Sequence, residues 1–327
     1  CKSRYIKKTE KTITQIGVDN SAAKILPRDT IVITSRGTVG ELVLLSEPMS
    51  FNQTCYGLKA RQGTDPLFLY YKLKSQISYL KSVSYGTVFN TITMRTFDEL
   101  KLSFPGLLEQ QSVAKILSKI DEKIELNQQI NKILETIGQT IFNHWFVKKE
   151  IGGEFTKGVL GDITTLEYGK GLPKEKRKSG NFPVYGSGGI YGVTEKFLVK
   201  GPGIIVGRAG RPGSVYISGK NFYPVDSTFY VNCKKEYFYY LYFLLKKLQL
   251  SHLNTGSAVP GLNRNIAYKV KIEYPDKKLV NEFNNFCSII FNKIRANQEL
   301  ILNLEKIRDK LLPRLMSGQI SVPIQSD

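Results

Sequence analysis

Two stretches of the chain carry apolar residues that are alternately four and three positions apart. The first stretch runs from Leu108 to about Lys149 and includes Leu117, Ile120, Ile124 and Leu134, whereas the second includes Ile290, Ile294, Ile301 and Leu304. This spacing places the apolar side chains along one seam of a long helix, as in a coiled coil. Asn127 and Asn297 fall at equivalent places in the two seams, and a buried Asn in such a seam costs stability but fixes the alignment of paired helices. We therefore predict two long helices that pair with each other.

The other segments have a different pattern. Thr30–Thr34, Gly203–Gly207 and Ser214–Ser218 are short runs rich in β-branched residues and set among Gly and Pro, which is typical of strands. Phe68–Leu80 and Tyr237–Leu250 are each predicted to form one apolar helix. The chain is thus expected to have an α+β fold, in which modules of strands and helices alternate with long helices.

The chain also repeats itself at long range. Tyr85–Thr93 corresponds to Thr255–Asn263, at the same offset in residue number that separates Asn127 from Asn297. Arg36–Gly40 corresponds to Ala209–Gly213, and Phe51–Thr54 corresponds to Pro224–Ser227, at an offset that is slightly longer. The period is about half of the chain, far longer than the unit of a solenoid, so the repeat indicates duplication of a whole domain. We expect two related modules in tandem.

These patterns predict the domain boundaries. Residues 1–107 form the first module, 108–150 the first long helix, 151–277 the second module, 278–318 the second long helix and 319–327 a tail. About forty residues of the second module, Val159 to Val199, are poorly matched in the first. We therefore expect the first module to be incomplete at its N-terminus.

The charge of the chain points to a polyanionic partner. There are 47 Lys and Arg against 28 Asp and Glu, for a formal net charge of +19. The basic residues are spread through both modules with aromatic residues between them, and no amphipathic basic anchor is present, so nucleic acid is favoured over a membrane surface. The alternative is a merely soluble basic protein from a genome that favours Lys.

The cysteines predict neither a disulfide framework nor a metal site. Cys1, Cys55, Cys233 and Cys287 are isolated in the sequence, and only His144 and His252 could assist them as ligands. We expect reduced thiols in a cytoplasmic protein. No apolar run approaches the length needed to span a membrane, and no signal peptide opens the chain.

Motifs for catalysis are weak. Tyr185–Gly192 hints at a dinucleotide-binding loop, but its third glycine is misplaced and no amphipathic helix follows. Gly219-Lys220 lacks the hydroxyl residue of a phosphate loop, because Asn221 follows. The carboxylates of Asp98–Lys101 could suggest a nuclease site, but Lys269 and Lys271 stand at the corresponding place in the second module, so a surface turn is favoured.

Polar residues in the Gly-rich turns are candidates for contact with DNA. Arginine can reach guanine edges or phosphates, and amide, carboxylate and hydroxyl groups can read adenine or cytosine edges, although the same side chains also stabilise ordinary turns. The candidates in the first module are Ser35, Arg36, Thr38, Gln53, Thr54, Tyr85, Thr87, Asn90 and Thr93. Those in the second are Lys170, Lys174, Tyr185, Ser187, Arg208, Arg211, Asp226, Ser227, Thr228, Asn254, Ser257 and Asn263.

Several local motifs carry a resemblance to a known family. They are Ala23–Pro27, Thr34–Gly40, Pro105–Gln111, Ile116–Ile124 and Phe142–Val147 in the first half, and Phe182–Ile190, Gly207–Gly210 and Leu311–Gly318 in the second. Together with the two basic modules and long helices, they resemble the specificity subunit of type I restriction-modification systems. The likeness covers nearly the whole chain, and its departure is the incomplete first module.

The resemblance implies two α/β target-recognition domains separated by two long antiparallel coiled-coil helices. Each domain would read one half of a bipartite site in double-stranded DNA, and the helices would set the gap and dock the modification subunits. Adenine methylation with S-adenosylmethionine, and cleavage driven by ATP with Mg²⁺, would belong to separate modification and restriction subunits. The chain itself would then be non-catalytic and would need no cofactor or metal.

Two other interpretations stay open at this point. The chain could be the targeting portion of a fused restriction-modification enzyme. It could also be a scaffold that binds proteins through its helices and carries basic domains only for solubility.

Overall fold

The computed structural model describes residues 3–85, 91–253 and 261–323, and these fall into two compact units. Unit 1 comprises Cys1–Gln129 with Gln298–Asp327, and unit 2 comprises Ile130–Asn297. The two long helices, α5 (Leu107–Phe142) and α8 (Lys277–Met316), each contribute one part to each unit.

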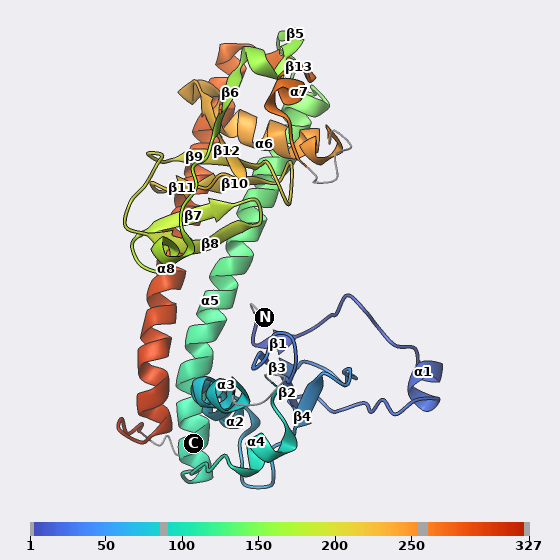
Figure 1. Ribbon diagram of the computed structural model, residues 1–327, viewed down its shortest axis with the longest axis vertical. Coiled ribbons are helices and arrows are strands. Elements are labelled where there is room, and N and C mark those ends of the chain that lie inside the picture. Colours follow the sequence, from blue (N-terminus) through green and yellow to red (C-terminus); the bar gives the residue numbers. More distant parts are fainter. Residues whose placement is uncertain (1–2, 86–90, 254–260, 324–327) are drawn as a thin grey trace. The chain divides into compact units, whose positions relative to one another are not determined.

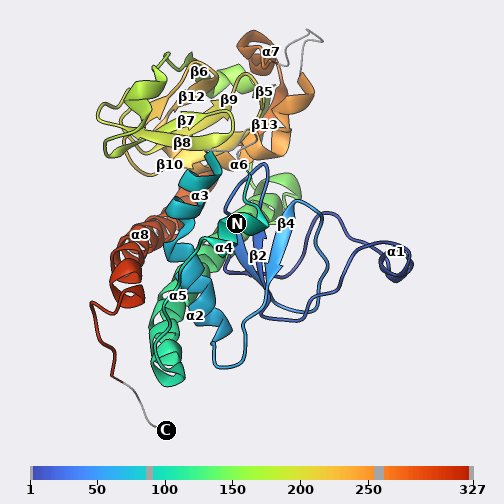
Figure 2. The same cartoon turned by 60° about the horizontal axis from the view of Figure 1, so that its bottom comes forward.

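Unit 1 is built around a four-stranded sheet in the order β1-β3-β2-β4 (Figure 1). Its elements are β1 (Tyr5–Ile6), α1 (Gln15–Asp19), β2 (Ile31–Thr34), β3 (Leu42–Leu45), β4 (Cys55–Leu58), α2 (Pro66–Ser75), α3 (Ile77–Tyr85) and α4 (Met94–Asp98). The helix α1 lies away from this sheet at the end of a long connection, as Figures 1 and 2 both show. Ile31, Ile33 and Leu44 on one face of the sheet pack into a core with α2 and the adjoining parts of α5 and α8.

The predicted helix Phe68–Leu80 is in fact two helices. Asp65 caps the first of them by accepting a 2.8 Å hydrogen bond from the Phe68 backbone N–H. The helix ends because the Gln76 N–H bonds to the carbonyl of Leu73, three residues back, while the Ser75 hydroxyl bonds to the Lys72 carbonyl. Such a tightened turn with a competing hydroxyl ends a helix. Periodicity alone did not reveal the break.

Unit 2 contains the same kind of sheet with additional strands. The first sheet has the order β10-β9-β12-β6, the second β11-β7-β8 and the third β13-β5. The strands are β5 (Phe155–Val159), β6 (Thr164–Tyr168), β7 (Phe182–Gly186), β8 (Gly189–Thr194), β9 (Gly203–Gly207), β10 (Val215–Ser218), β11 (Tyr223–Pro224), β12 (Thr228–Cys233) and β13 (Lys271–Pro275). The helices are α6 (Phe238–Leu248) and α7 (Arg264–Tyr268), with short 3-10 helices η2 (Leu160–Asp162), η3 (Lys174–Arg177), η4 (Lys235–Tyr237) and η5 (Leu250–Leu253).

Two hydrophobic clusters hold unit 2 together. One face of the β9–β12 sheet packs with α6 and with Phe142 and Phe283 of the long helices. On the other face, Ile205 packs with Tyr185 of β7 and Phe222, so the second sheet covers the first. Burial raises the pKa of the Cys287 thiol in the first cluster to about 12, which keeps it neutral and consistent with a free, reduced cysteine.

The duplication predicted from sequence is present in the backbone. In unit 1, β2 pairs with β3 so that Val32 faces Val43, and in unit 2 Ile205 faces Tyr216. Both positions are shifted along the chain by the same offset that separates Arg36–Gly40 from Ala209–Gly213. The isolated β-bridge between Leu26 and Met49 in unit 1 also has a counterpart at this offset in unit 2, the bridge between Val199 and Phe222. The α+β fold with two related modules and long helices is therefore confirmed.

The two long helices run antiparallel within each unit. In unit 1, Asp121 of α5 bonds to Arg308 of α8, and in unit 2 Asn131 bonds to Asn297 at 2.9 Å. The predicted seam residues Leu117, Ile124, Asn127, Ile290, Ile294, Asn297 and Ile301 are buried, and Ile120, Leu134 and Leu304 are half-buried. Asn127 Nδ2 donates to the Lys123 carbonyl of its own helix at 2.7 Å. Leu117 also belongs to the core of unit 1, so the helices pack against the modules as well as each other.

The exit from α5 is set by backbone geometry. A short π-helix, η1 (Asn143–Val147), follows α5, and Lys149 then takes a positive φ of 58°. Gly152 and Gly153 also have positive φ angles, which glycine adopts without steric cost. The glycine pair thus lies just beyond the end of the helix. The domain boundaries proposed above stay a prediction.

Candidate nucleic-acid interface

In unit 2, four loops meet at the ends of β6, β9 and β12. The Arg208 N–H donates to the Ser227 carbonyl at 2.8 Å, and the Arg208 carbonyl accepts from the Leu262 N–H at 2.8 Å. The Gly169 N–H donates to the Thr228 carbonyl at 3.0 Å. These backbone bonds join segments that lie far apart in the sequence, so the polar residues of several turns are brought to one edge of the sheet.

Two arginines and a tyrosine form the centre of this edge. The guanidinium carbons of Arg208 and Arg264 lie 5.7 Å and 4.7 Å from the centre of the Tyr168 ring. Arg208 Nε also donates to the Asp226 carbonyl at 2.9 Å. A guanidinium near an aromatic face is attracted by the ring quadrupole, so the ring helps to hold both cations in place.

Glycines allow these loops to pack closely. A Cβ on Gly169 would lie 2.1 Å from the Val225 carbonyl oxygen, and one on Gly207 would lie 2.2 Å from the Arg211 carbonyl oxygen. Neither distance is possible for real atoms. The turn that carries Tyr168, and the turn that carries Arg208 and Arg211, therefore depend on glycine at these positions.

Most second-module candidates that the structure describes lie at this edge. Lys170, Arg211, Asp226 and Asn263 are exposed, and Ser187 and Ser227 are half-buried. Asn263 also caps α7, because its Oδ1 accepts from the Asn265 N–H at 2.9 Å. Ser187 lies beside the β9–β10 turn, since a Cβ on Gly210 would be 3.2 Å from the Ser187 hydroxyl oxygen.

Three other second-module candidates are placed differently. Thr228 is fully buried and donates its hydroxyl to the Val225 carbonyl at 2.7 Å. Tyr185, on β7 of the second sheet, is buried against Ile205 of the first sheet, and burial raises the pKa of its phenol. Lys174 is exposed on η3, which packs against β8. Buried groups bonded within the protein cannot contact DNA, so we leave Thr228 and Tyr185 out of the interface.

Unit 1 repeats the backbone arrangement with different side chains. The Ser35 N–H donates to the Thr54 carbonyl at 2.8 Å, and the Ser35 carbonyl accepts from the Ile92 N–H at 3.2 Å. Ser35 thus occupies the position of Arg208, Thr54 that of Ser227 and Ile92 that of Leu262. Both offsets found in the sequence therefore correspond to the same hydrogen bonds in the structure.

The first-module candidates divide in the same way. Arg36, Thr38 and Gln53 are exposed, and Thr93 is exposed at the N-cap of α4. Ser35 is buried and donates its hydroxyl to the Thr54 carbonyl at 2.9 Å, so it holds the turn and we leave it out of the interface. Thr54 is half-buried and bonds to Asn52. Thr87, Asn90, Asn254 and Ser257, and the side chain of Tyr85, lie outside the described residues.

Sequence reasoning missed Tyr168 and Arg264. Both had a usable signal, because Tyr168 directly precedes the Gly169-Lys170-Gly171 turn and Arg264 follows the candidate Asn263. What was absent from the sequence was the pairing of β6 with β12, which sets Tyr168 opposite Phe229.

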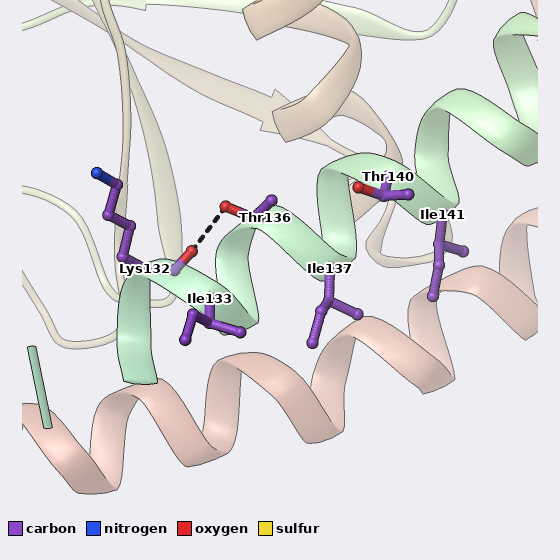
Figure 3. Close-up of a pocket in the computed structure, with 6 residues that line it drawn as sticks. All are labelled: Lys132, Ile133, Thr136, Ile137, Thr140 and Ile141. Atoms are coloured by element: carbon purple, nitrogen blue, oxygen red, sulfur yellow. Dashed lines mark hydrogen bonds between the residues drawn. The ribbon is translucent and has the colours of Figure 1, made fainter. Parts of the chain in front are cut away.

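A second surface lies on the part of α5 that belongs to unit 2. Lys132, Ile133, Thr136, Ile137, Thr140 and Ile141 line a shallow groove of about 330 Å³ (Figure 3). Ile133 and Ile137 are 59% and 40% exposed, which is unusual for isoleucine on a helix whose other face is buried. This groove is open to a partner.

The described residues contain no cluster of three or more metal-ligating side chains. None of the described helices is long and apolar enough to cross a membrane. The protein is thus basic and consists of two tandem modules, each of which presents polar loops at the ends of its strands. These features are typical of proteins that read nucleic-acid sequence.

Comparison with known proteins identifies the family. The model of the type I restriction modification DNA specificity domain matches residues 3–136 and 153–306, so the chain belongs to that family. It is 29% identical to the type I restriction enzyme MjaIX specificity subunit of Methanocaldococcus jannaschii, over 97% of this chain and 84% of that protein. It is 24% identical to a putative type I specificity subunit of Mycoplasma genitalium, over 88% and 81% of the two chains.

A solved structure supports the fold. The crystal structure of the S subunit of a type I restriction-modification system from M. genitalium superposes with a TM-score of 0.58, at 22% identity, over 93% of this chain and 85% of that one. The family match over residues 3–136 and 153–306 confirms the resemblance seen in the sequence motifs.

Proposed function

We propose that each unit binds one half of a bipartite site in double-stranded DNA and that this chain supplies the sequence specificity of a type I restriction-modification complex. The observation that carries this proposal is the repeated hydrogen-bond frame. Ser35, Thr54 and Ile92 in unit 1 and Arg208, Ser227 and Leu262 in unit 2 make the same backbone bonds, while the side chains presented around them differ. One scaffold with two sets of side chains suits two different half-sites.

The charge of the chain supports DNA as the ligand. Arg36 and Gln53 in unit 1 and Lys170, Arg211 and Asp226 in unit 2 are exposed around these frames. Basic side chains can neutralise phosphates, and the amide and carboxylate groups can bond to base edges in the major groove.

The long helices are proposed to dock the modification subunits. The groove lined by Ile133, Ile137 and Ile141 on α5 supports this, because exposed apolar surface on a helix gains free energy when a partner covers it. Methylation with S-adenosylmethionine, and cleavage with ATP and Mg²⁺, are proposed to reside on separate modification and restriction subunits in the cytoplasm. In that scheme this chain has no catalytic role.

Salt-dependent binding tests the proposal. Affinity for duplex DNA, measured by fluorescence anisotropy, should fall with a log–log slope of about −0.9 per phosphate contacted. Mapping of methylated adenines in the host genome, with and without the gene, should show loss of one bipartite motif. A slope near zero, or an unchanged methylation map, would refute the assignment.

A further inference from the structure

Tyr168 ends β6 at the edge where the loops of unit 2 meet. Its side chain is 48% exposed, and its ring centre lies 5.0 Å from that of Phe229, its buried partner on β12. The guanidinium groups of Arg208 and Arg264 lie within cation–π range of the same ring. Phe229 therefore holds the Tyr168 ring against the core, and the exposed part of the ring can hold the two arginines in place.

Each arginine is also anchored to the backbone. Arg208 Nε donates to the Asp226 carbonyl at 2.9 Å, and Arg264 Nη1 donates to the Leu166 carbonyl at 3.5 Å. Within residues 3–85, 91–253 and 261–323, the Arg208 side chain makes no second hydrogen bond and neither arginine forms an ion pair. The two η nitrogens of Arg208 therefore have no acceptor among these described residues.

Two neighbouring guanidinium groups that form no ion pair within the described residues favour a ligand rich in acceptors. Guanine presents two acceptors, O6 and N7, on its major-groove edge, and the forked N–H groups of arginine match them as a pair. Because Nε is already bonded to Asp226, the η1 and η2 groups are the donors that remain to make this pairing.

We propose that Arg208, positioned by Tyr168 beside Arg264, reads a guanine in the half-site that unit 2 binds. The inference rests on the proposed function and adds the base, the reading residue and the residue that positions it. In unit 1 the position of Arg208 is held by Ser35, which is buried, so the inference concerns unit 2 alone.

The experiment is selection of preferred duplexes from a randomised library by the full chain, followed by affinity measurements on single sites. The wild-type protein should select a guanine in one half-site. Arg208→Ala and Arg208→Lys should both lose that guanine preference, by roughly 5- to 150-fold, because alanine removes the fork and lysine keeps the charge but not the fork. Tyr168→Leu should lose the preference and Tyr168→Phe should retain it, since only the ring is needed. Arg295→Ala, which removes an exposed arginine from α8, is the matched control and should select the wild-type sequence.

A base analogue distinguishes a contact of Arg208 with the guanine base from a contact with the charged DNA backbone. Replacing the selected guanine by 7-deazaguanine removes N7, so it should weaken wild-type binding and leave Arg208→Ala unaffected. If Arg208→Ala weakens all duplexes equally and lowers the salt slope by about one phosphate, Arg208 contacts the backbone and the inference is wrong. If the variant selects the same guanine as the wild type, the inference is also wrong while the proposed function stands. If the wild-type chain selects no sequence, the proposed function fails and the inference fails with it.

Discussion

Arg308 of α8 donates a 2.8 Å hydrogen bond to Asp121 of α5 within unit 1. The Asp121 side chain is 7% exposed, and its other oxygen accepts from the Tyr71 hydroxyl of α2 at 2.8 Å. Arg4, next to β1, donates to that same hydroxyl at 3.1 Å. One buried carboxylate therefore connects both long helices with the module, and its loss would leave several buried donors without a partner.

Asp121→Asn should destabilise unit 1 strongly. The amide keeps the shape but removes the negative charge that faces Arg308 and Lys74, and breaking a buried ion pair costs about 3 kcal/mol. Urea unfolding followed by circular dichroism measures the free energy of unfolding. Asp309→Asn is the matched control, because Asp309 pairs with the same Arg308 but is 62% exposed, and its loss should cost under about 1 kcal/mol. Equal effects of the two changes would show that burial of the pair is not what matters.

Parts of this architecture could be predicted from sequence because they depend on local pattern. The strands β2, β9 and β10 and the long helices follow from apolar spacing, and the repeat offsets matched the hydrogen bonds of Ser35 and Arg208. Tyr168 could not be placed, because its neighbour Phe229 is distant in sequence and a strand partner is chosen by packing of the whole sheet. Asp121 was equally hidden, since a charged residue in a helix is normally solvent-exposed and only its three-dimensional partners make burial possible.

Unit 2 should become less stable at acid pH because the Glu135 carboxylate becomes protonated. Burial alone would raise the pKa of this carboxyl, but hydrogen bonds from Lys246 at 2.6 Å and Tyr242 at 2.5 Å outweigh burial and hold its pKa below the ordinary value. A carboxyl with a lowered pKa in the folded state stabilises the protein above its unfolded pKa of about 4.5, and this contribution is lost as the pH falls through the folded value.

Glu135→Gln should therefore be less stable than the wild type at pH 7, and the difference should shrink below pH 4.5. Fluorescence of Trp145, the single tryptophan, reports unfolding of unit 2 because its ring packs on Phe283. Glu282→Gln, at an exposed position on α8, is the control and should be as stable as the wild type at pH 7. A stability difference that stays constant from pH 7 to pH 3 would contradict this role of Glu135.

An Asp substitution on the buried face of α5 should affect stability, whereas one on its exposed face should affect only binding of a partner. Ile124 is 4% exposed in unit 1, so Ile124→Asp would bury an unpaired carboxylate and should lower the melting temperature sharply. Ile294→Asp, in the seam of α8 within unit 2, should act similarly. Ile133→Asp lies in the exposed groove and should melt like the wild type, yet capture less modification subunit in co-purification. Wild-type capture by a folded Ile133→Asp variant would remove the groove from the proposed docking surface.

Gly169→Ala should abolish sequence reading by unit 2 alone. The added Cβ would lie 2.1 Å from the Val225 carbonyl oxygen and 2.6 Å from that of Pro224, so the turn between Tyr168 and Lys170 must move. Gly171→Ala is the matched control two residues away, because nothing lies within 4 Å of its added Cβ and its φ is not positive. Binding is measured on duplexes in which each half-site is randomised in turn. Gly169→Ala should lose preference in one half-site and keep it in the other, whereas Gly171→Ala should keep both. Loss of both halves at once would mean that the units do not read DNA independently, since the substitution lies wholly within unit 2.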